Sequence, residues 1–453
     1  MVTSDLWRLL APLLGLVLLS GCASFDPHNL IARHLPAGSR TGIDDGSTLS
    51  AATRRAAVDA VWTTISERYY RADLNGVDWA AARKRWEPEA MAASTDDEFW
   101  ERLDLMVAEL ADAHTRVESL SQVTRRKAQQ SLSLGMGLRE IDGEIVVTSV
   151  HPESDAYWAG VRVGMRLQAV GQRAAKEQWS QWRTTARKSS SPQAALRMPV
   201  RKLNEAAIVA AQKNPREALN LAFSRPDGTV FSARLKPVAL STKASVSKRM
   251  LPSGIGYIRL TAFSESVRSD VLNAVTALKD APALILDLRG NGGGSGAMAE
   301  ALVGSFVRKK TVIARTETRT GQPVTLAFGA IKIISLERSV PGRDDAYDGK
   351  VAVLLDNDSA SASEGTAAAL QSLGRAVVVG EVSCGCLLGY LGYTTLPGGG
   401  ELAFSEIGFV TTKGDRIEGR GVIPDIAVTR TRADFAAQRD RALEAAQEAL
   451  LAK

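Results

Sequence analysis

The sequence is poor in residues that commonly hold metals or build disulfide frameworks, with three cysteines and four histidines among 453 residues. Two of the cysteines, Cys384 and Cys386, are separated by one glycine, and no histidine or further cysteine stands beside them to complete a tetrahedral metal site. One intervening residue is also too little for a relaxed disulfide, although an oxidising compartment could still produce a strained, labile bridge. We therefore predict no metal and no cofactor.

Basic clusters are lacking too. The 56 Lys and Arg exceed the 50 Asp and Glu by six, and the basic residues are scattered, without a run that has aromatics between them. This pattern is weak evidence for nucleic acid, and we predict no nucleic-acid partner. A Gly-Lys-Ser/Thr phosphate loop is also absent, which argues against a nucleotide site. The apolar content of 45% over this length predicts two or three domains, each with a sizeable core.

The N-terminus lacks an apolar run of membrane-spanning length. The run at 9–19 has eleven residues, follows Arg8, and is typical of a signal peptide at 1–21. Its end, Leu19-Ser20-Gly21-Cys22, resembles a bacterial lipobox, which implies cleavage before Cys22, lipidation of its thiol and a tether at 22–50. Ala23 after that cysteine implies a protein of the cell envelope, anchored in the outer membrane and facing the periplasm. A signal peptide that contains a cysteine by chance is the alternative.

Two further segments differ in their periodicity. Residues 51–125 have helical spacing, with Val58, Val61 and Ile65 on one face and a capping box at 95–98, and predict a helical N-terminal domain. Residues 130–240 consist of short strand patterns that resemble a PDZ domain, with a basic insertion at 174–216. The resemblance implies a carboxylate-binding loop whose backbone N–H groups would receive a peptide C-terminus. This loop comprises Leu134, Gly135, Met136, Gly137 and Leu138. A structural β-domain that binds nothing is the alternative.

The stretch 351–373 combines a fully apolar strand pattern, a polar turn and an Ala-rich helix, with Ser361 where the helix begins. The unpaired N–H groups of a helix start can stabilise an oxyanion beside a nucleophilic serine. A second apolar strand, 283–288, leads into a Gly-rich turn at 290–294, and an α/β sheet would bring both turns to one edge. Taken alone, this stretch is better interpreted as an ordinary helix start with Ser361 as a cap.

Five motifs in this order resemble the tail-specific, or carboxyl-terminal-processing, serine peptidases. The resemblance implies a multi-domain α/β protein whose crotonase-like catalytic core spans 245–430, followed by a C-terminal helix at 431–453. It also implies Ser361 as the nucleophile and the N–H groups of Gly293 and Ala362 as the oxyanion hole. The motifs are Ile255–Leu260, Asp287–Gly294, Ser359–Glu364, Gly374–Glu381 and Glu418–Asp425.

This chain lacks the general base that most of that family uses. Where those enzymes have a Gly-Lys pair, this chain has Gly385-Cys386, and where they have the following glutamine it has Tyr390. A Ser–Lys dyad is therefore excluded. The tricorn-core-like branch uses histidine as the base and glutamate as its orienting acid, and residues 112–115 and Glu418 resemble its motifs. The other histidines are His28, His34 and His151, in the tether and the PDZ-like segment, which leaves His114.

We therefore predict an envelope serine endopeptidase that cleaves peptides or proteins, selected in part by their free C-termini, through an acyl-enzyme at Ser361. Two alternatives remain. The missing lysine is compatible with a catalytically inactive lipoprotein adaptor that binds peptide C-termini. Cys386 could also act near Ser361 as a redox switch or as the nucleophile itself.

Overall fold

The computed structural model of the protein describes residues 48–184, 187–214 and 218–452, together with residues 26, 28 and 30. The predicted signal peptide, Cys22 and His34 lie outside the described residues. The chain forms two compact units, and each is described here by itself. Unit one comprises 1–120, 314–338 and 388–410; unit two comprises 121–313, 339–387 and 411–453.

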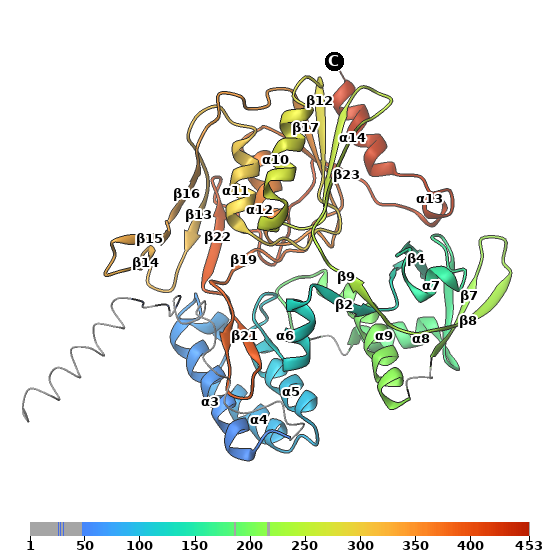
Figure 1. The fold of residues 1–453 in the computed structure, drawn as a ribbon, viewed down its shortest axis with the longest axis vertical. Helices are drawn as coiled ribbons and strands as arrows, with labels where there is room; N and C mark the ends of the chain where they lie inside the picture. The colour runs from blue at the N-terminus through green and yellow to red at the C-terminus, as the bar shows by residue number, and fades with distance from the viewer. Residues whose placement is uncertain are drawn as a thin grey trace, which may run out of the picture. The chain divides into compact units, whose positions relative to one another are not determined.

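Helices between residues 51 and 108 form the described core of unit one, and Figure 1 draws them in blue. The helical spacing predicted in this region is confirmed, because Val58, Val61 and Ile65 are fully buried in one core with Phe99 and Leu103. The helical elements are α3 (Ala51–Arg68), η1 (Leu74–Gly76), α4 (Trp79–Met91) and α5 (Asp96–Ala108).

The predicted capping box at the start of α5 forms only in part. The Thr95 hydroxyl accepts the Glu98 N–H, as expected, at 3.1 Å. The Glu98 carboxylate instead accepts the N–H and the hydroxyl of Ser94, one residue before the cap. Thr95 therefore caps one free N–H of the helix start, while Glu98 fixes the residue before the cap.

Short strands complete unit one. They form the sheets β1-β21-β20 and β14-β15, and most residues of the sheet β16-β13-β22-β19. The strands are β1 (Arg116–Glu118), β13 (Thr311–Glu317), β14 (Val324–Leu326), β15 (Ile331–Ile334), β16 (Glu337–Val340), β19 (Leu388–Gly389), β20 (Thr394–Thr395), β21 (Glu401–Ala403) and β22 (Ile407–Thr411).

The centre of unit two is a six-stranded sheet of order β10-β11-β12-β17-β18-β23, in which all neighbours except β10 and β11 run parallel. The strand predicted at 351–355 is β17, and its apolar residues are all buried, as expected for a strand covered on both faces. The strands are β10 (Val246–Met250), β11 (Gly256–Leu260), β12 (Ala283–Asp287), β17 (Lys350–Leu355), β18 (Val377–Gly380) and β23 (Ile426–Ala427).

Helices cover this sheet, and the α/β fold class is confirmed (Figure 1). They are η2 (Glu265–Val267), α10 (Arg268–Ala277), α11 (Gly296–Gly304), α12 (Ala362–Ser372), α13 (Arg432–Ala436) and α14 (Arg441–Leu451). The single C-terminal helix predicted at 431–453 is wrong, because two helices form there. Gln438 has a positive φ of 54°, which interrupts α13, and Asp440 then caps α14 by accepting the Leu443 N–H.

The predicted PDZ-like segment also belongs to unit two. Its strands form a sheet of order β3-β4-β5-β7-β8, with β6 paired to β5 and with β2 and β9 paired to each other. The elements are α6 (Leu120–Lys127), β2 (Gln130–Ser133), β3 (Met136–Ile141), β4 (Glu144–Val150), α7 (Asp155–Trp158), β5 (Arg166–Val170), β6 (Arg173–Ala174), β7 (Leu219–Ser224), β8 (Val230–Leu235) and β9 (Val238–Ser241).

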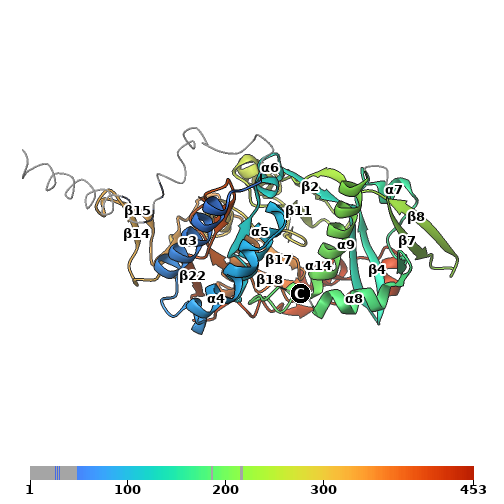
Figure 2. The ribbon, with the colours of Figure 1, turned by 90° about the horizontal axis from the view of Figure 1, so that it is seen from below.

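The basic insertion is part of this domain rather than an interruption of it. It forms α8 (Ala175–Thr184) and α9 (Ala194–Lys213), and α9 packs against the sheet, as Figure 2 shows. Trp179 and Leu203 are buried in the same core as the strands. The helices of the insertion therefore help to bury the core of this sheet.

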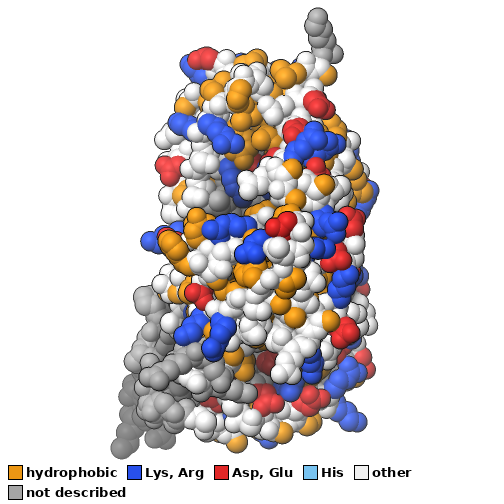
Figure 3. Space-filling model, turned by 90° about the vertical axis from the view of Figure 1, so that its right-hand side faces the viewer, with side chains coloured by type: hydrophobic (Ala, Val, Ile, Leu, Met, Phe, Trp, Pro, Cys, Tyr) orange, Lys and Arg blue, Asp and Glu red, His pale blue; other side chains and the backbone are white. Residues whose placement is uncertain are grey.

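The described surface fits the charge pattern of the sequence. On the face in Figure 3, Lys and Arg side chains are mixed with acidic and apolar ones rather than gathered in one patch. Among the described residues, no helix combines the length and the apolar character needed to cross a membrane.

Candidate active site

Ser361 lies in a strained turn between β17 and α12. Its backbone has φ 55° and ψ −116°, a conformation that non-glycine residues rarely adopt and that clusters at functional sites. Ala362 is the first residue of α12, so its N–H has no partner within the helix. A strand, a sharp turn that exposes a serine and a helix start together form the arrangement that presents a nucleophile beside an oxyanion site.

The Gly-rich turn after β12 packs against this serine turn, as the predicted sheet edge requires. The backbone carbonyl of Asn291 accepts the Ala360 N–H at 3.0 Å and the Ser363 hydroxyl at 2.8 Å. At Gly293, with φ 93°, a Cβ would lie 2.7 Å from the Ser361 Cβ and 2.8 Å from the Ala362 nitrogen. Glycine is therefore required at 293, because any side chain would collide with the nucleophile turn.

The two N–H groups predicted for the oxyanion hole thus lie close together, although they differ in availability. The Gly293 N–H donates to the side-chain oxygen of Asn291 at 2.9 Å. For Gly293 to hold an oxyanion, this N–H must exchange the Asn291 oxygen for the substrate oxygen. Ala362, at the helix start, needs no such exchange.

The buried carboxylate of Glu364 holds the serine turn from behind. Its two oxygens accept the N–H groups of Ser361 (2.9 Å), Gly385 (2.7 Å) and Cys386 (3.0 Å), together with the Ser383 hydroxyl (2.6 Å). Burial raises the pKa of Glu364, while the four donors favour its ionised form and oppose that rise. One side chain therefore ties residue 361 to a loop about twenty residues further along the chain.

A disulfide joins Cys384 and Cys386 within that loop. The Cys386 carbonyl accepts the Ser361 N–H at 3.0 Å, and the Cys384 N–H donates to the Ser359 carbonyl at 2.9 Å. Both cysteines are buried, and neither sulfur is a free thiol in this state. The disulfide is therefore present although only one residue separates the two cysteines. In this state Cys386 has no nucleophilic thiolate.

Glu418 reaches the same loop from the other side. Its Oε2 accepts the Leu387 N–H at 2.6 Å, and its Oε1 accepts the hydroxyl of Ser190. The following residue, Gly419, donates its N–H to the Gly385 carbonyl at 2.9 Å. The predicted nucleophile and the predicted acid are therefore linked through the backbone of Cys386 and Leu387.

His114 lies in unit one, in the turn between α5 and β1. The buried carboxylate of Asp112 holds this turn by accepting the His114 N–H at 2.7 Å and the Thr115 hydroxyl at 2.6 Å. The His114 side chain is 9% exposed, and its Nδ1 has no hydrogen-bond partner in the described part of the structure. Burial lowers the pKa of His114 to about 4, helped by the Arg116 charge and opposed by Asp112, so the imidazole is neutral at pH 7.

No local pattern predicted the aromatic cluster beside this turn. Arg116 donates to the His114 carbonyl at 3.2 Å and pairs with Glu118 at 2.9 Å. Its guanidinium lies over the rings of Tyr390 and Tyr393, 5.6 and 5.4 Å from their centres. Tyr390, which occupies the glutamine position of the Ser–Lys branch, thus packs on this cation instead of orienting a base.

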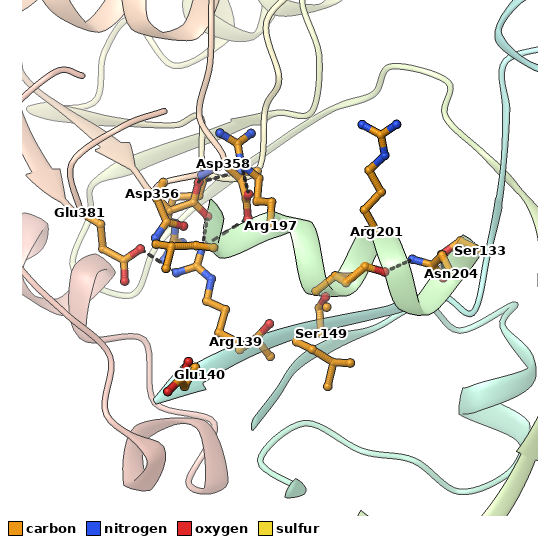
Figure 4. A pocket seen from close by; sticks show the side chains of 18 of the residues that line it. Ser133, Arg139, Glu140, Ser149, Arg197, Arg201, Asn204, Asp356, Asp358 and Glu381 are labelled. Atoms are coloured by element: carbon orange, nitrogen blue, oxygen red, sulfur yellow. Dashed lines mark hydrogen bonds and ion pairs between the residues drawn. The ribbon is translucent and has the colours of Figure 1, made fainter. Parts of the chain in front are cut away.

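A groove of about 1330 Å³ lies in unit two between β3, α9 and the carboxyl ends of the central strands (Figure 4). It includes Gly137 and Leu138 of the predicted carboxylate loop. It reaches the turn before Ser361 but not Ser361 itself. Apolar side chains line the part between the edge strand and the helix, namely Leu132, Leu138, Ile141, Leu196, Val200 and Ile208.

Several N–H groups of the predicted carboxylate loop already have partners. The side chain of Asn204 on α9 accepts the Leu134 N–H at 2.8 Å, and the Ser133 hydroxyl accepts the Gly135 N–H at 2.9 Å. Gly135 itself is required by shape, since a Cβ there would lie 2.2 Å from the Ser154 Cβ. Met136 to Leu138 belong to β3, which pairs with β4. A bound carboxylate would have to use N–H groups of these residues that do not bond to β4, or replace the contacts of Leu134 and Gly135.

One arginine joins the edge strand of this domain to the catalytic core. Arg139 on β3 lies 2.6 Å from Glu381 and 3.3 Å from Asp358, as the dashed lines in Figure 4 mark. These carboxylates raise the pKa of Arg139 further, against the effect of its burial. Among the described residues, no group of three or more His, Cys, Asp or Glu side chains is placed to hold a metal ion.

A strand–turn–helix nucleophile site in a parallel α/β sheet defines a hydrolase of the acyl-transfer type, and comparison with known proteins names its family. Residues 254–428 match the model of peptidase family S41, and residues 50–108 match that of the tricorn protease C1 domain. The chain is a serine peptidase with a family S41 peptidase domain and a tricorn C1 domain, and its relatives are named carboxyl-terminal-processing proteases.

Individual relatives carry that name. The chain is 25% identical to a carboxyl-terminal-processing protease of Picosynechococcus sp., over 83% of this chain and 83% of that protein. It is 27% identical to the chloroplastic carboxyl-terminal-processing peptidase 2 of Arabidopsis thaliana, over 72% and 59%. These names do not favour the inactive-adaptor alternative.

Solved structures agree on the fold. The photosystem II D1 C-terminal processing protease superposes with a TM-score of 0.54 at 19% identity, covering 88% of this chain and 98% of that one. Mature CPAF superposes with a TM-score of 0.61 at 14% identity, covering 85% and 94%. At such identities the match supports the architecture alone.

Replacing Glu364 by glutamine tests the buried anchor. The glutamine amide has only one oxygen to accept from the four donors, and its NH₂ group would face donors that need an acceptor. The serine turn should therefore shift. We expect kcat to fall by roughly 10²-fold, comparable to the loss of one oxyanion donor, in a protein that remains folded by circular dichroism. Glu444→Gln, on an exposed pair with Arg439, is the matched control. Wild-type turnover in Glu364→Gln would show that the carboxylate has no part in placing Ser361.

Proposed function

We propose that the chain is a lipid-anchored serine endopeptidase of the bacterial envelope in which Ser361 forms an acyl-enzyme. The Ser361 hydroxyl attacks the scissile carbonyl and its proton passes to His114. The resulting oxyanion is held by the N–H of Ala362 and, after release from Asn291, by that of Gly293. His114 then protonates the leaving amine, and water hydrolyses the acyl-enzyme in the reverse sense. The observation that carries this proposal is the positive-φ turn of Ser361, fixed by Glu364 and packed against Gly293.

The state of His114 supports its role as the base. A buried, neutral imidazole with an unpaired nitrogen is ready to accept a proton at neutral pH. Glu418 could orient it only by exchanging the Ser190 hydroxyl for the imidazole, since its other oxygen already accepts the Leu387 N–H. The triad would then be complete only in the working enzyme, as is common for catalytic hydrogen bonds.

We further propose that the groove between β3 and α9 receives the C-terminus of a peptide or protein substrate. An extended peptide can pair with the edge strand β3, while the apolar lining takes its last side chains. N–H groups at 136–138 that do not bond to β4 would meet the carboxylate. This capture would place part of the substrate in unit two before cleavage at Ser361.

Substitution of the catalytic residues tests the proposed chemistry. Ser361→Ala and His114→Ala should each lower kcat by roughly 10³-fold or more, and the double variant should lose no more than either, because the residues act as one unit. Glu418→Gln should be milder. His28→Ala, on a histidine near Glu406, is the control. Near-wild-type hydrolysis of peptides by folded His114→Ala would eliminate the histidine base.

The pH profile gives a second check of His114. Burial lowers its pKa to about 4, and only the neutral form above that value accepts the serine proton. We therefore expect kcat/KM to be level across neutral pH and to fall as the pH approaches about 4. This limb should be absent from the residual activity of His114→Ala. A base that titrates near 6.5 would show that His114 is not buried in the working enzyme.

Substrate capture can be measured without cleavage in the Ser361→Ala variant of the full chain. A fluorescent peptide with an apolar, free C-terminal residue should bind roughly tenfold or more tightly than the same peptide as its C-terminal amide. The amide differs only in the charge and acceptor count of its end, so it is its own control. Equal binding of acid and amide would remove carboxylate capture.

Anchoring is tested at Cys22, because its thiol is the proposed attachment point. Cys22→Ser should leave the protein soluble in the envelope or unprocessed, since lipid chains at the mature N-terminus supply the membrane affinity. Fractionation of cells together with the mass of the N-terminal peptide distinguishes these outcomes from the wild type. A variant that stays with the membrane and is cleaved at the same place would contradict the lipobox interpretation.

A further inference from the structure

We propose that the Cys384–Cys386 disulfide is a reversible redox site, reduced by dithiols, whose oxidised form is needed for full turnover at Ser361. The inference rests on the proposed role of Ser361. Its first support is that the bridge is a poor candidate for a structural staple. A disulfide stabilises a fold mainly by restricting the unfolded chain, and a bridge between residues only two apart restricts very little. Any functional effect of this disulfide must therefore come from where it lies rather than from the short loop that it closes.

That position is unusual in its contact with a cation. Nη2 of Arg197, on α9, lies 2.6 Å from the Cys384 sulfur and 3.8 Å from the Cys386 sulfur. A guanidinium at this distance stabilises a thiolate and so makes Cys384 a better leaving group in thiol–disulfide exchange. Cys384 is fully buried, while Cys386 keeps 7% of its surface exposed. The arrangement favours attack on Cys386 with departure of the Cys384 thiolate.

The exchange balances with a dithiol as the reductant. One thiolate of the dithiol attacks the Cys386 sulfur, the S–S bond breaks, and its electron pair goes to Cys384 beside Arg197. The second thiol of the reductant then attacks the mixed disulfide and releases Cys386. The reductant leaves as a disulfide; of its two protons, one goes to Cys386 and the other to solvent, so that Cys384 stays a thiolate beside Arg197. An oxidised dithiol carrier reverses each step.

The bridge is also coupled directly to the catalytic turn. Within the segment 384–386, the backbone donates to Ser359 and twice to Glu364, and it accepts the Ser361 N–H. Two separated thiols need more room than a bonded pair, because the S–S bond is about 2.05 Å long and non-bonded sulfurs lie well beyond it. Reduction should therefore move the Cys386 carbonyl that fixes Ser361, and with it the N–H of Ala362.

The experiment uses the full chain with Cys22→Ser, which leaves only the two cysteines of the bridge. The protein is titrated with dithiothreitol against its oxidised form, and free thiols are counted by maleimide mass shift. Fluorophosphonate labelling of Ser361 and peptide hydrolysis are measured on the same samples. Two thiols should appear together, and labelling and hydrolysis should fall in step with them by roughly tenfold. This loss is smaller than the roughly 10²-fold loss of an oxyanion donor because the donor is displaced rather than removed.

Three variants separate the causes. Cys384→Ala/Cys386→Ala should fold, and its labelling and hydrolysis should not respond to dithiothreitol. Arg197→Gln should require a larger ratio of reduced to oxidised dithiol to reach the midpoint, because the leaving thiolate loses its cation. Lys202→Gln, on the same helix and paired with Glu205, should leave the midpoint unchanged.

The outcomes distinguish this inference from the proposed function. Equal or higher labelling after both thiols have been counted would overturn the redox site while leaving Ser361 as the nucleophile. No labelling in either state would reject the proposed function, and the thiol count would still report the bridge. A bridge that resists excess dithiothreitol in the folded protein, or a midpoint unmoved in Arg197→Gln, would also overturn the inference.

Discussion

The catalytic half of unit two depends on one buried carboxylate. Glu364 is fully buried, and an ion in that position costs several kcal/mol of desolvation. Four donors offset this cost, because hydrogen bonds to a charged group contribute about 1.5–3 kcal/mol each. The compensation holds only while all four donors are in place. The nucleophile turn and the loop at 383–386 are therefore fixed together, and neither can move without leaving the carboxylate unsatisfied.

Local patterns in the sequence predicted the elements around this carboxylate but not its role. The apolar run of β17, the polar turn and the Ala-rich α12 are readable because each depends on neighbouring residues alone. A glutamate three residues after the helix cap reads as half of a capping box, and Glu364 does accept the Ser361 N–H. Its other three donors come from the loop after β18, and they arrive only because β18 pairs with β17. That pairing is tertiary, so no local pattern reports it.

The PDZ-like segment shows the same limit. The strands and the loop at 134–138 follow from alternation and glycine placement, whereas α9 was hidden by its basic residues and by Pro199 within it. Leu203 shows why the helix belongs to the domain, since it is buried against the sheet. The side-chain oxygen of Asn204, on the same helix, already accepts a hydrogen bond from the Leu134 N–H. The recognition chemistry of the loop is thus set partly by a side chain about seventy residues away.

The groups around residue 386 restrict how Ser361 can be activated. The Cys386 N–H donates to Glu364, and the Cys386 carbonyl accepts the Ser361 N–H. Its sulfur is bonded to Cys384. Cys386, at the position where the Ser–Lys branch is expected to have lysine, therefore supplies no base. A histidine with a pKa of about 4 is always in its accepting form at neutral pH, but it is a weak base. A histidine of this kind becomes an effective general base only if the imidazolium is stabilised as it forms. An adjacent carboxylate can provide this stabilisation. In the proposed mechanism, the burial of His114 therefore creates the need for a partner acid, and Glu418 is the carboxylate proposed for that role.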